Sequence, residues 1–303
     1  ISMTSCVSFI VPEGLFKTRS YSGFVEEIEK NGHIKSVTTF TEYVFDNAVT
    51  GNLVFVFSKN DEGDIKHFHF NEAFELLEIP EKDIKLFRKI ELGTKPLNEY
   101  ATLFKGMVIK DRDLVVSEHS KGKKNTLLLG KNISKWTINS KFYTNYNELE
   151  IIGGTKNIDK HNHHPRILIR RTGDTLYCSY LNEKALTEST LYSCWSTLES
   201  ISNEVLLGLL NSKPLDYYNK EFFITNQQGF PQIRMSDLEI LPIKYPDKVI
   251  EIKIERLVDE IIVKKSESVT ANISALEREI DQLVYRLYGL TEEEIKIVEG
   301  KTH

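Results

Sequence analysis

Arg166-Ile-Leu-Ile-Arg-Arg-Thr-Gly-Asp-Thr-Leu-Tyr-Cys-Ser-Tyr180 decides the fold class of the central region. Residues 167–171 and 176–180 are short apolar runs of strand type, and Gly173-Asp174 between them is a turn signal. Runs of this length around such a dipeptide are typical of adjacent strands. A similar run, residues 145–152, ends at the glycine pair Gly153-Gly154. We therefore expect residues 96–243 to form a β-rich, irregular domain with long surface loops and one helix near residues 203–211.

The amino-terminal region has an α/β pattern. Residues 5–11 are expected to form a short buried strand, which Pro12 and Gly14 end. A helix over residues 21–30 and strands over 34–40 and 53–57 follow. So short a segment cannot cover both faces of a parallel-type sheet, so the pattern predicts the tail of a larger one. The chain also begins almost directly in a strand-like run, which indicates a truncated protein.

The carboxy-terminal region changes period. Its apolar residues lie alternately four and three positions apart, at Val269, Ile273, Leu276, Ile280, Leu283 and Leu287, and earlier at Ile250, Ile254, Leu257 and Ile261. This spacing predicts two amphipathic helices with a hinge near residues 264–268. We expect the pair to pack on the body of the protein rather than to form a free coiled coil. Gly289 is a stop signal, and Thr291 with Glu294 forms a capping box for a last short helix.

Charge is unevenly distributed along the chain. The 303 residues carry a net charge of −5, which alone argues against a nucleic-acid partner. Residues 105–141, however, hold nine basic and three acidic side chains. A local basic face is sufficient for phosphate binding. No apolar run reaches the length of a membrane span, and the three cysteines lack paired spacing. We expect a cytoplasmic protein without a membrane partner.

Three stretches carry a family resemblance. The first is Phe9-Ile-Val-Pro-Glu-Gly-Leu-Phe16 with Val44-Phe-Asp-Asn-Ala-Val-Thr-Gly-Asn-Leu-Val-Phe-Val-Phe57. The second is Lys95-Pro-Leu-Asn-Glu-Tyr-Ala-Thr-Leu-Phe-Lys-Gly106, with Leu206-Leu-Gly-Leu-Leu-Asn-Ser-Lys213 and Thr225-Asn-Gln-Gln-Gly-Phe-Pro-Gln-Ile-Arg-Met-Ser-Asp-Leu-Glu-Ile-Leu-Pro242. The third is Glu279-Ile-Asp-Gln-Leu-Val-Tyr-Arg-Leu-Tyr-Gly-Leu-Thr-Glu-Glu-Glu-Ile295. Together they resemble the carboxy-terminal half of the N-6 adenine DNA methyltransferases of restriction-modification systems, in the group with a TaqI-like specificity domain.

The resemblance implies a division of the chain and a set of partners. Residues 1–60 would be a remnant of the methyltransferase domain, 61–95 a connector with helical stretches near 71–77 and 81–90, 96–245 the target-recognition domain and 246–303 a helical segment. The implied partners are double-stranded DNA and the remainder of the methyltransferase, with association through the helices as a further expectation. Phe45 matches the family position that packs on the extruded adenine, where an aromatic face stacks on the base.

The catalytic motifs of the family are missing. An adenine methyltransferase needs an Asn/Asp-Pro-Pro-Tyr/Phe loop and a glycine-rich turn for S-adenosylmethionine. None of the eight prolines is adjacent to another, and no Gly-x-Gly turn is present. We therefore expect no cofactor in this chain, S-adenosylmethionine in the intact parent, and no methylation by the chain alone.

Candidate DNA contacts lie in the recognition domain. For phosphates they are Lys110, Arg112, Lys121, Lys123, Lys124, Lys131 and Lys135, of which three lie in a basic loop at residues 121–125 that we expect to be mobile. For bases they are Arg166, Arg170 and Arg171, because arginine can bind guanine with two hydrogen bonds. Residue parity places Arg166 and Arg170 on one strand face and Arg171 on the other. The competing interpretation is a structural ion pair with Asp174 or Glu150. Asn226 and Gln227 could contact adenine edges, but closing a turn is the favoured interpretation.

Two further groups of residues suggest metal binding or nuclease chemistry. His161, His163 and His164 beside Asp159 suggest zinc, but no second cluster has standard spacing, which favours a polar loop. Asp247 and Glu251-Ile-Lys253 superficially resemble a nuclease motif, yet they begin a predicted helix and are expected on its solvated face. Two alternative functions remain: the specificity subunit of a multi-subunit system, which residues 1–57 disfavour, and a protein–protein interaction module.

Overall fold

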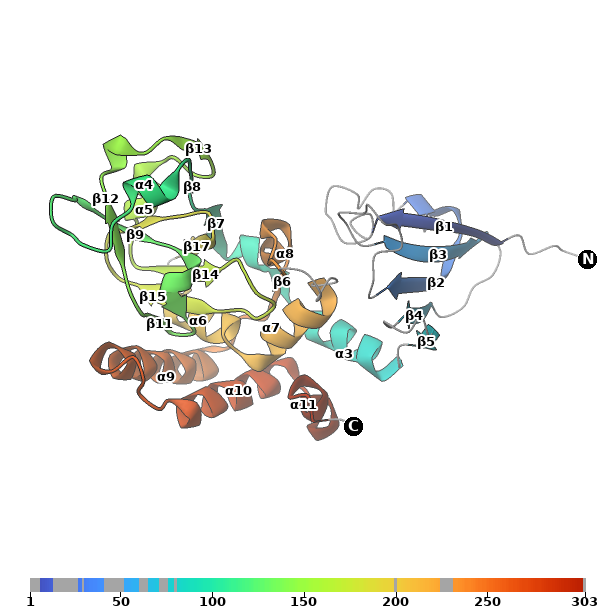
Figure 1. The fold of residues 1–303 in the computed structure, drawn as a ribbon. Coiled ribbons are helices and arrows are strands. Elements are labelled where there is room, and N and C mark those ends of the chain that lie inside the picture. Colours follow the sequence, from blue (N-terminus) through green and yellow to red (C-terminus); the bar gives the residue numbers. More distant parts are fainter. Residues whose placement is uncertain are drawn as a thin grey trace, which may run out of the picture. The chain divides into compact units, whose positions relative to one another are not determined.

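The computed structural model describes residues 6–12, 27–28, 30–40, 52–59, 65–70, 76–78, 81–198, 201–223 and 231–301. The chain forms two compact units (Figure 1). Unit 1 comprises residues 1–88 and 222–231, and unit 2 comprises residues 89–221 and 232–303. In the described part of the chain, no helix combines the length and the apolar character that crossing a bilayer requires.

Unit 1 contains a five-stranded sheet. Its strands are β1 (Cys6–Pro12), β2 (His33–Phe40), β3 (Asn52–Ser58), β4 (Lys66–Phe70) and β5 (Leu76–Glu78), in the order β1-β3-β2-β4-β5. β2 and β4 are parallel and the other neighbours are antiparallel. Ile34, Leu53 and Phe55 are buried. The expected strands over 34–40 and 53–57 are thus present, and residues 27, 28 and 30 of the expected first helix are helical.

Three expectations for this unit are wrong. The strand β1 is largely exposed rather than buried, with Phe9 52% exposed although its ring stacks on Phe55. The range 61–95 is more than a connector, because it supplies the inner strand β4 and the edge strand β5. The alternation of histidine and phenylalanine over residues 67–70 was the sequence signal for the inner strand β4. Leu76 and Leu77 lie in β5 rather than in a helix. The helix expected at 81–90 is α3 (Glu81–Glu91).

Unit 2 is built around short, mainly antiparallel strands. A four-stranded sheet has the order β15 (Cys178–Leu181), β14 (Arg166–Arg170), β17 (Leu191–Ser196), β7 (Ala101–Lys105). The predicted neighbours around residues 173–174 are thus confirmed as the antiparallel pair β14–β15. A three-stranded sheet joins β12 (Phe142–Thr144), β9 (Asn125–Leu128) and β16 (Leu186–Thr187). Three strand pairs complete the set: β8 (Val108–Ile109) with β13 (Ile151–Gly153), β10 (Ile133–Ser134) with β11 (Thr137–Ile138), and β6 (Lys95–Pro96) with β18 (Pro242–Ile243).

Short helices occur more often in this unit than the sequence suggested. They are α4 (Arg112–Val115), α5 (Ile158–Asn162), α6 (Asn203–Leu210), α7 (Lys213–Tyr218) and α8 (Met235–Glu239), with a π-helical turn at Asn219–Phe223 and 3-10 turns at Leu97–Glu99, Gly130–Asn132 and Tyr146–Glu148. Only α6 was expected. It begins at Ser202, whose Oγ accepts hydrogen bonds from the N–H groups of Glu204 and Val205, and residues 205–210 are buried.

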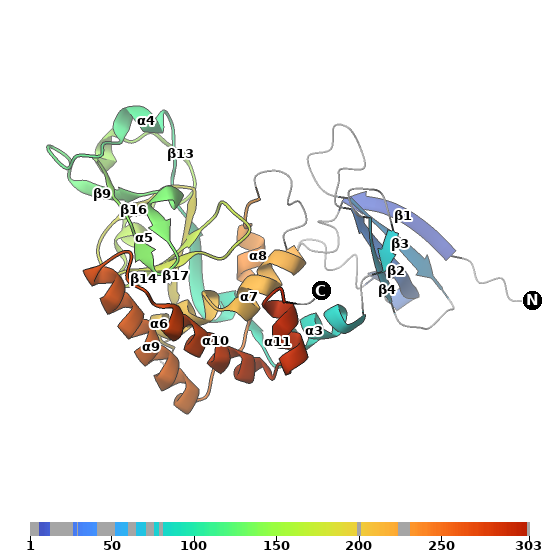
Figure 2. The same cartoon turned by 60° about the horizontal axis from the view of Figure 1, so that its bottom comes forward.

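The carboxy-terminal helices follow most of the predicted spacing, but residues 268–273 join the first two instead of the hinge expected near 264–268, so Val269 and Ile273 precede the second helix. They are α9 (Lys248–Glu267), α10 (Ser274–Tyr288) and α11 (Glu292–Val298). α9 and α10 lie side by side and pack against α6 and α7, which confirms packing on the body of the unit (Figures 1 and 2). Gly289, with a φ of 68°, ends α10, and Thr291 and Glu294 form the expected capping box of α11.

Candidate nucleic-acid interface

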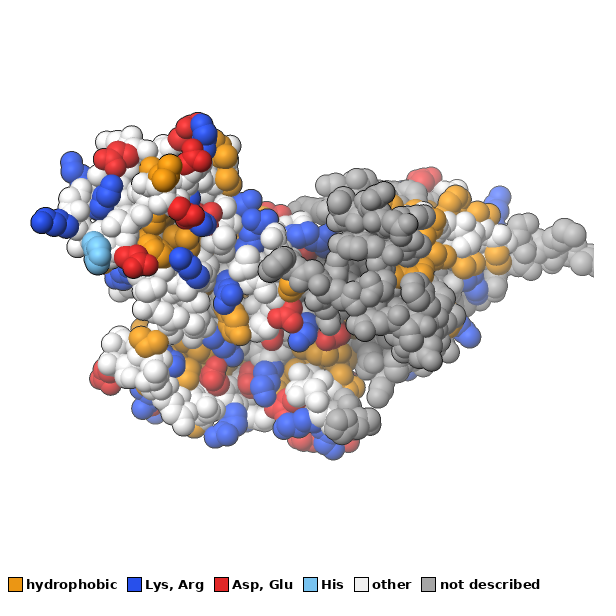
Figure 3. Space-filling view, viewed as in Figure 1, with side chains coloured by type: hydrophobic (Ala, Val, Ile, Leu, Met, Phe, Trp, Pro, Cys, Tyr) orange, Lys and Arg blue, Asp and Glu red, His pale blue; other side chains and the backbone are white. Residues whose placement is uncertain are grey.

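The basic loop of residues 121–125 leads into β9, and amide side chains fasten its carboxy-terminal end. Asn145 Oδ1 accepts a hydrogen bond from Lys124 N–H, and Asn125 Oδ1 accepts one from Tyr146 N–H. Gly122 has a φ of +76°, a conformation that glycine adopts without strain. The loop is therefore a built turn with hydrogen bonds to residues 145 and 146. Figure 3 shows basic side chains protruding over the connection between α4 and β9.

The candidate phosphate contacts fall into two groups, those that form an ion pair with an acidic side chain and those that do not. Lys110 Nζ lies 2.9 Å from Glu150, Lys123 Nζ lies 3.2 Å from Glu148, and Arg112 Nε lies 3.1 Å from Asp113. Among the described residues, Lys121, Lys124 and Lys131 have no acidic partner, and Lys131 Nζ lies 4.5 Å from the centre of the Phe142 ring. Exposed ion pairs of this kind contribute less than about 1 kcal/mol, so phosphate can compete for the paired side chains as well.

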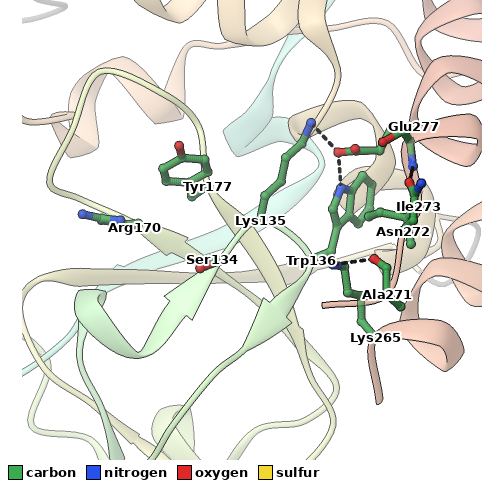
Figure 4. A pocket seen from close by; sticks show the side chains of 11 residues that line it. Ser134, Lys135, Trp136, Arg170, Tyr177, Lys265, Ala271, Asn272, Ile273 and Glu277 are labelled. Carbon is green, nitrogen blue, oxygen red and sulfur yellow. Dashed lines mark hydrogen bonds and ion pairs between the residues drawn. The ribbon is translucent and has the colours of Figure 1, made fainter. Parts of the chain in front are cut away.

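Lys135 serves a different purpose from the one expected. Its Nζ lies 3.0 Å from Glu277 of α10, and Glu277 also accepts a hydrogen bond of 2.8 Å from Trp136 Nε1 (Figure 4). Burial opposes ionisation of this carboxylate, but Lys135 and Trp136 together hold the pKa of Glu277 below its ordinary value. These residues line a pocket that also includes Arg170 and Lys265. Lys135 thus ties the β10–β11 hairpin to α10.

Arg166 cannot contact a base in this structure. Its side chain is fully buried, and its guanidinium donates hydrogen bonds to the carbonyl oxygens of His161, His163 and Ala185. Burial lowers the pKa of Arg166 to about 10, so the group is charged at neutral pH. The prediction of a base contact at this position is wrong, and so is the alternative of an ion pair with Glu150 or Asp174, because backbone carbonyls take all three hydrogen bonds.

Arg170 and Arg171 remain half-exposed and diverge as residue parity predicts. The Arg170 guanidinium lies 5.6 Å from the centre of the Tyr177 ring, whereas Arg171 donates a 2.7 Å hydrogen bond to Gln232. Neither side chain pairs with the two acids proposed for them. Asp174 lies 3.4 Å from Lys220, and Glu150 is the partner of Lys110. Both arginines therefore keep charge available to a ligand.

The histidines of residues 161–164 make structural contacts within unit 2. His161 is buried: its Nε2 lies 2.8 Å from the Thr155 carbonyl, and its Nδ1 lies 3.1 Å from Thr187 N–H. The exposed His163 ring stacks on Trp195 with centroids 4.2 Å apart. Within the described residues, no group of three or more potential ligands could hold a metal ion. The nuclease-like residues have separate roles as well, since Asp247 caps α9 and Glu251 is buried rather than solvated.

Sequence reasoning missed some residues, and others it named lie outside the described part of the chain. Lys156 and Lys160, on and before α5, are exposed and have no acidic partner among the described residues. The charge count stopped at residue 141, and extending it would have found them. The contact between His163 and Trp195 joins positions 32 apart and has no local signal. Phe45, Asn226 and Gln227 fall outside the described residues.

One family model matches part of the chain, and one solved structure resembles its fold. Residues 125–243 match the family model of the TaqI-like C-terminal specificity domain. A comparison with curated protein sequences finds no match. The fold resembles the type IIL restriction-modification enzyme MmeI, solved in complex with DNA, with a TM-score of 0.59 and 10% identity over 98% of this chain and 49% of that one. The chain thus spans about half the length of that enzyme.

Two further solved structures have lower scores. They are the HsdS subunit from Thermoanaerobacter tengcongensis, with a TM-score of 0.40 and 12% identity over 69% of this chain and 51% of that one, and the type IIG restriction endonuclease BpuSI, with a TM-score of 0.36 and 13% identity over 94% and 47%. The matched range runs from β9 through β18 and contains most of the β-rich part of unit 2. By the match to the family model, residues 125–243 are similar to TaqI-like C-terminal specificity domains.

Proposed function

We propose that this chain recognises a target sequence in double-stranded DNA as the specificity part of a restriction-modification enzyme that methylates adenine at N6. The match of residues 125–243 to a specificity domain carries this proposal. It is supported by the likeness in fold to an enzyme solved with DNA. Because the chain spans about half of that enzyme, the parent's activity and partners belong to the proposal.

The charges of unit 2 suggest how such a domain would divide its contacts. Lys121, Lys124 and Lys131 carry charge that no described acid neutralises, so they are suited to phosphates. Phosphate contacts fix the position of the duplex, and contacts to base edges select its sequence. Arg171 is suited to the second role, since its guanidinium is held by Gln232 and not by a carboxylate. Bidentate binding of guanine would use the same donors.

Methyl transfer itself would come from the rest of the parent protein. The chain has neither adjacent prolines nor a Gly-x-Gly turn, so its own residues do not fit S-adenosylmethionine. In the parent, that cofactor would supply the methyl group and bind upstream of the region described. Phe45 would stack on the adenine that such enzymes turn out of the duplex.

Binding of the purified chain to DNA tests the proposal. Fluorescence anisotropy with a labelled duplex is measured between 50 and 200 mM salt, and selection from a randomised duplex library follows. We expect affinity to fall steeply with salt, because phosphate contacts release counterions. We also expect the library to converge on one sequence. Binding that is independent of salt, or a library that never converges, would show that the domain does not recognise a DNA target.

A further inference from the structure

The helix α9 has an outward face that nothing in the described structure covers. We call this face the outer stripe of α9; its members are Val249, Ile252, Arg256, Asp259, Val263 and Ser266. They repeat at intervals of three and four residues, so they form one seam along the helix. Val249 is 65% exposed, Ile252 is 53% exposed and Val263 is 54% exposed. The opposite face of α9, with Ile254, Leu257, Val258 and Ile261, is buried in unit 2.

The outer stripe carries charge that is not neutralised within the chain. Arg256 and Asp259 are neighbours on the stripe, yet neither has an ion pair among the described residues. Burial, and then the carboxylates of Glu204 and Glu255, raise the pKa of Asp259. Asp259 therefore lies among like charges without a described cation. Lys253 flanks the stripe on the side of Glu260, and Glu260 has only a 3.6 Å contact with Lys264.

We propose that two copies of this chain associate through the outer stripe, with their α9 helices antiparallel. A twofold axis between positions 257 and 258 places Ile252 of one copy against Val263 of the other. The same axis places Arg256 against Asp259 and Val249 against Ser266. Each of these residue pairs forms one layer of the interface and occurs twice by symmetry, as in an isologous interface. The apolar layers are covered, and Arg256 and Asp259 each acquire an opposite charge.

The charge pattern favours this orientation over a parallel one. In a parallel pair, Arg256 would meet Arg256 and Asp259 would meet Asp259, and like charges in contact repel. In the antiparallel pair, Lys253 also lies beside Glu260 of the other copy, which adds two symmetry-related ion pairs along one flank of the seam. Charged residues in a helical seam specify register at some cost in stability. A single pair of helices buries less area than the roughly 1,200 Å² of stable interfaces, so the association should be reversible and concentration-dependent.

Exchanging the two charges gives a sharp test with the full chain. Sedimentation velocity should show the mass rising from 35.0 kDa toward twice that value as concentration increases. Arg256→Asp places two aspartates in each central layer, and Asp259→Arg places two arginines there. We expect each variant alone to dimerise at least tenfold more weakly. An equal mixture of the two should associate again, because every central layer then joins Asp to Arg.

Two controls keep the result tied to the stripe. Thermal unfolding followed by circular dichroism, at a concentration low enough for every chain to be monomeric, should be the same for all chains, since both positions are exposed. Lys296→Asp, on α11 and away from the stripe, should dimerise like the original chain. The proposal is overturned if the original chain stays monomeric at every concentration, if the single variants dimerise equally well, or if their mixture fails to associate.

Discussion

At the scale of single residues, Arg166 is a buried structural cation, and its removal should lower the stability of unit 2. Replacing it with methionine keeps the length of the side chain but leaves three carbonyl oxygens, two of them in buried hydrogen bonds, without this donor. An unsatisfied buried acceptor costs roughly 1–3 kcal/mol. We expect Arg166→Met to lower the free energy of unfolding by roughly 3 kcal/mol or more, as urea denaturation would measure. Arg170→Met, at the half-exposed neighbour, should cost about 1 kcal/mol. Equal losses would contradict the assignment.

The sequence alone could not have separated these arginines. Arg166 and Arg170 have the same parity on β14 and similar neighbours in the sequence. What distinguishes them is the set of carbonyls around the Arg166 guanidinium, from residues near α5 and from Ala185. Those groups meet only after strands far apart in the sequence have paired. Parity did predict the divergence of Arg170 and Arg171, because it depends on strand geometry alone.

His161 should make the stability of the chain depend on pH. Burial lowers the pKa of His161 to about 4. The hydrogen bond to the Thr155 carbonyl opposes this shift, and the positive charge of Arg166 adds to it. Below pH 6.5 the unfolded chain binds a proton that the folded chain excludes until about pH 4. Stability is therefore complete above pH 6.5 and declines as the pH falls to about 4, by about 3 kcal/mol from this group. Urea denaturation at pH 7.0, 5.5 and 4.5 measures the decline.

The matched variant for this prediction is His161→Gln. Glutamine can still donate to the Thr155 carbonyl but does not titrate in this range. Its stability should be lower at pH 7 and should decline by less between pH 7.0 and 4.5 than that of the original chain. If both proteins lose the same amount, His161 is not the group responsible.

At the scale of elements, the close approach of α6 and α9 depends on Gly208. A Cβ atom at this position would lie 2.6 Å from Ile254 Cγ2 and 3.1 Å from Val258 Cγ2. We expect Gly208→Ala to lower the free energy of unfolding by about 1 kcal/mol or more, since overpacking outweighs the better helix propensity of alanine. Adding Gly208→Ala to Ile254→Ala should cost little, because the clashing methyl is gone. Double-mutant denaturation measures this coupling, and strict additivity would argue against the clash.

The elements also differ in how well the sequence predicted them. α9 and α10 run for 20 and 15 residues with a sustained apolar repeat, which is why both helices could be predicted, although they are joined by residues 268–273 and not by the hinge expected near residues 264–268. The strands of unit 2 have two to six residues. So short a run carries little periodic signal, and its partner is fixed by distant contacts, as in the parallel pairing of β9 with β16. Hence the β-rich class could be predicted, whereas the sheet order and the short helices could not.

At the scale of the whole molecule, net charge and local charge point in opposite directions. The chain is acidic overall, with 44 acidic and 39 basic residues. In the region before β9, however, Lys121 and Lys124 are exposed and lack acidic partners among the described residues, while Lys123 is held by Glu148. The rest of the chain is acidic and would repel DNA, so DNA would approach at basic segments such as this one, which we call the approach surface. The sequence located this segment through its charge count, but not which of its lysines are neutralised.

The double variant Lys121→Gln, Lys124→Gln tests that approach surface. If each lysine contacts one phosphate, removing both should flatten the dependence of log affinity on log salt by about 1.8, since each contact contributes about 0.9. The loss should be the same for every duplex sequence, because phosphates carry no sequence information. The matched control is Arg286→Gln, Lys296→Gln, which removes the same charge from exposed positions on α10 and α11. An equal change in slope for both pairs would mean that net charge alone governs binding and that the loop makes no phosphate contact.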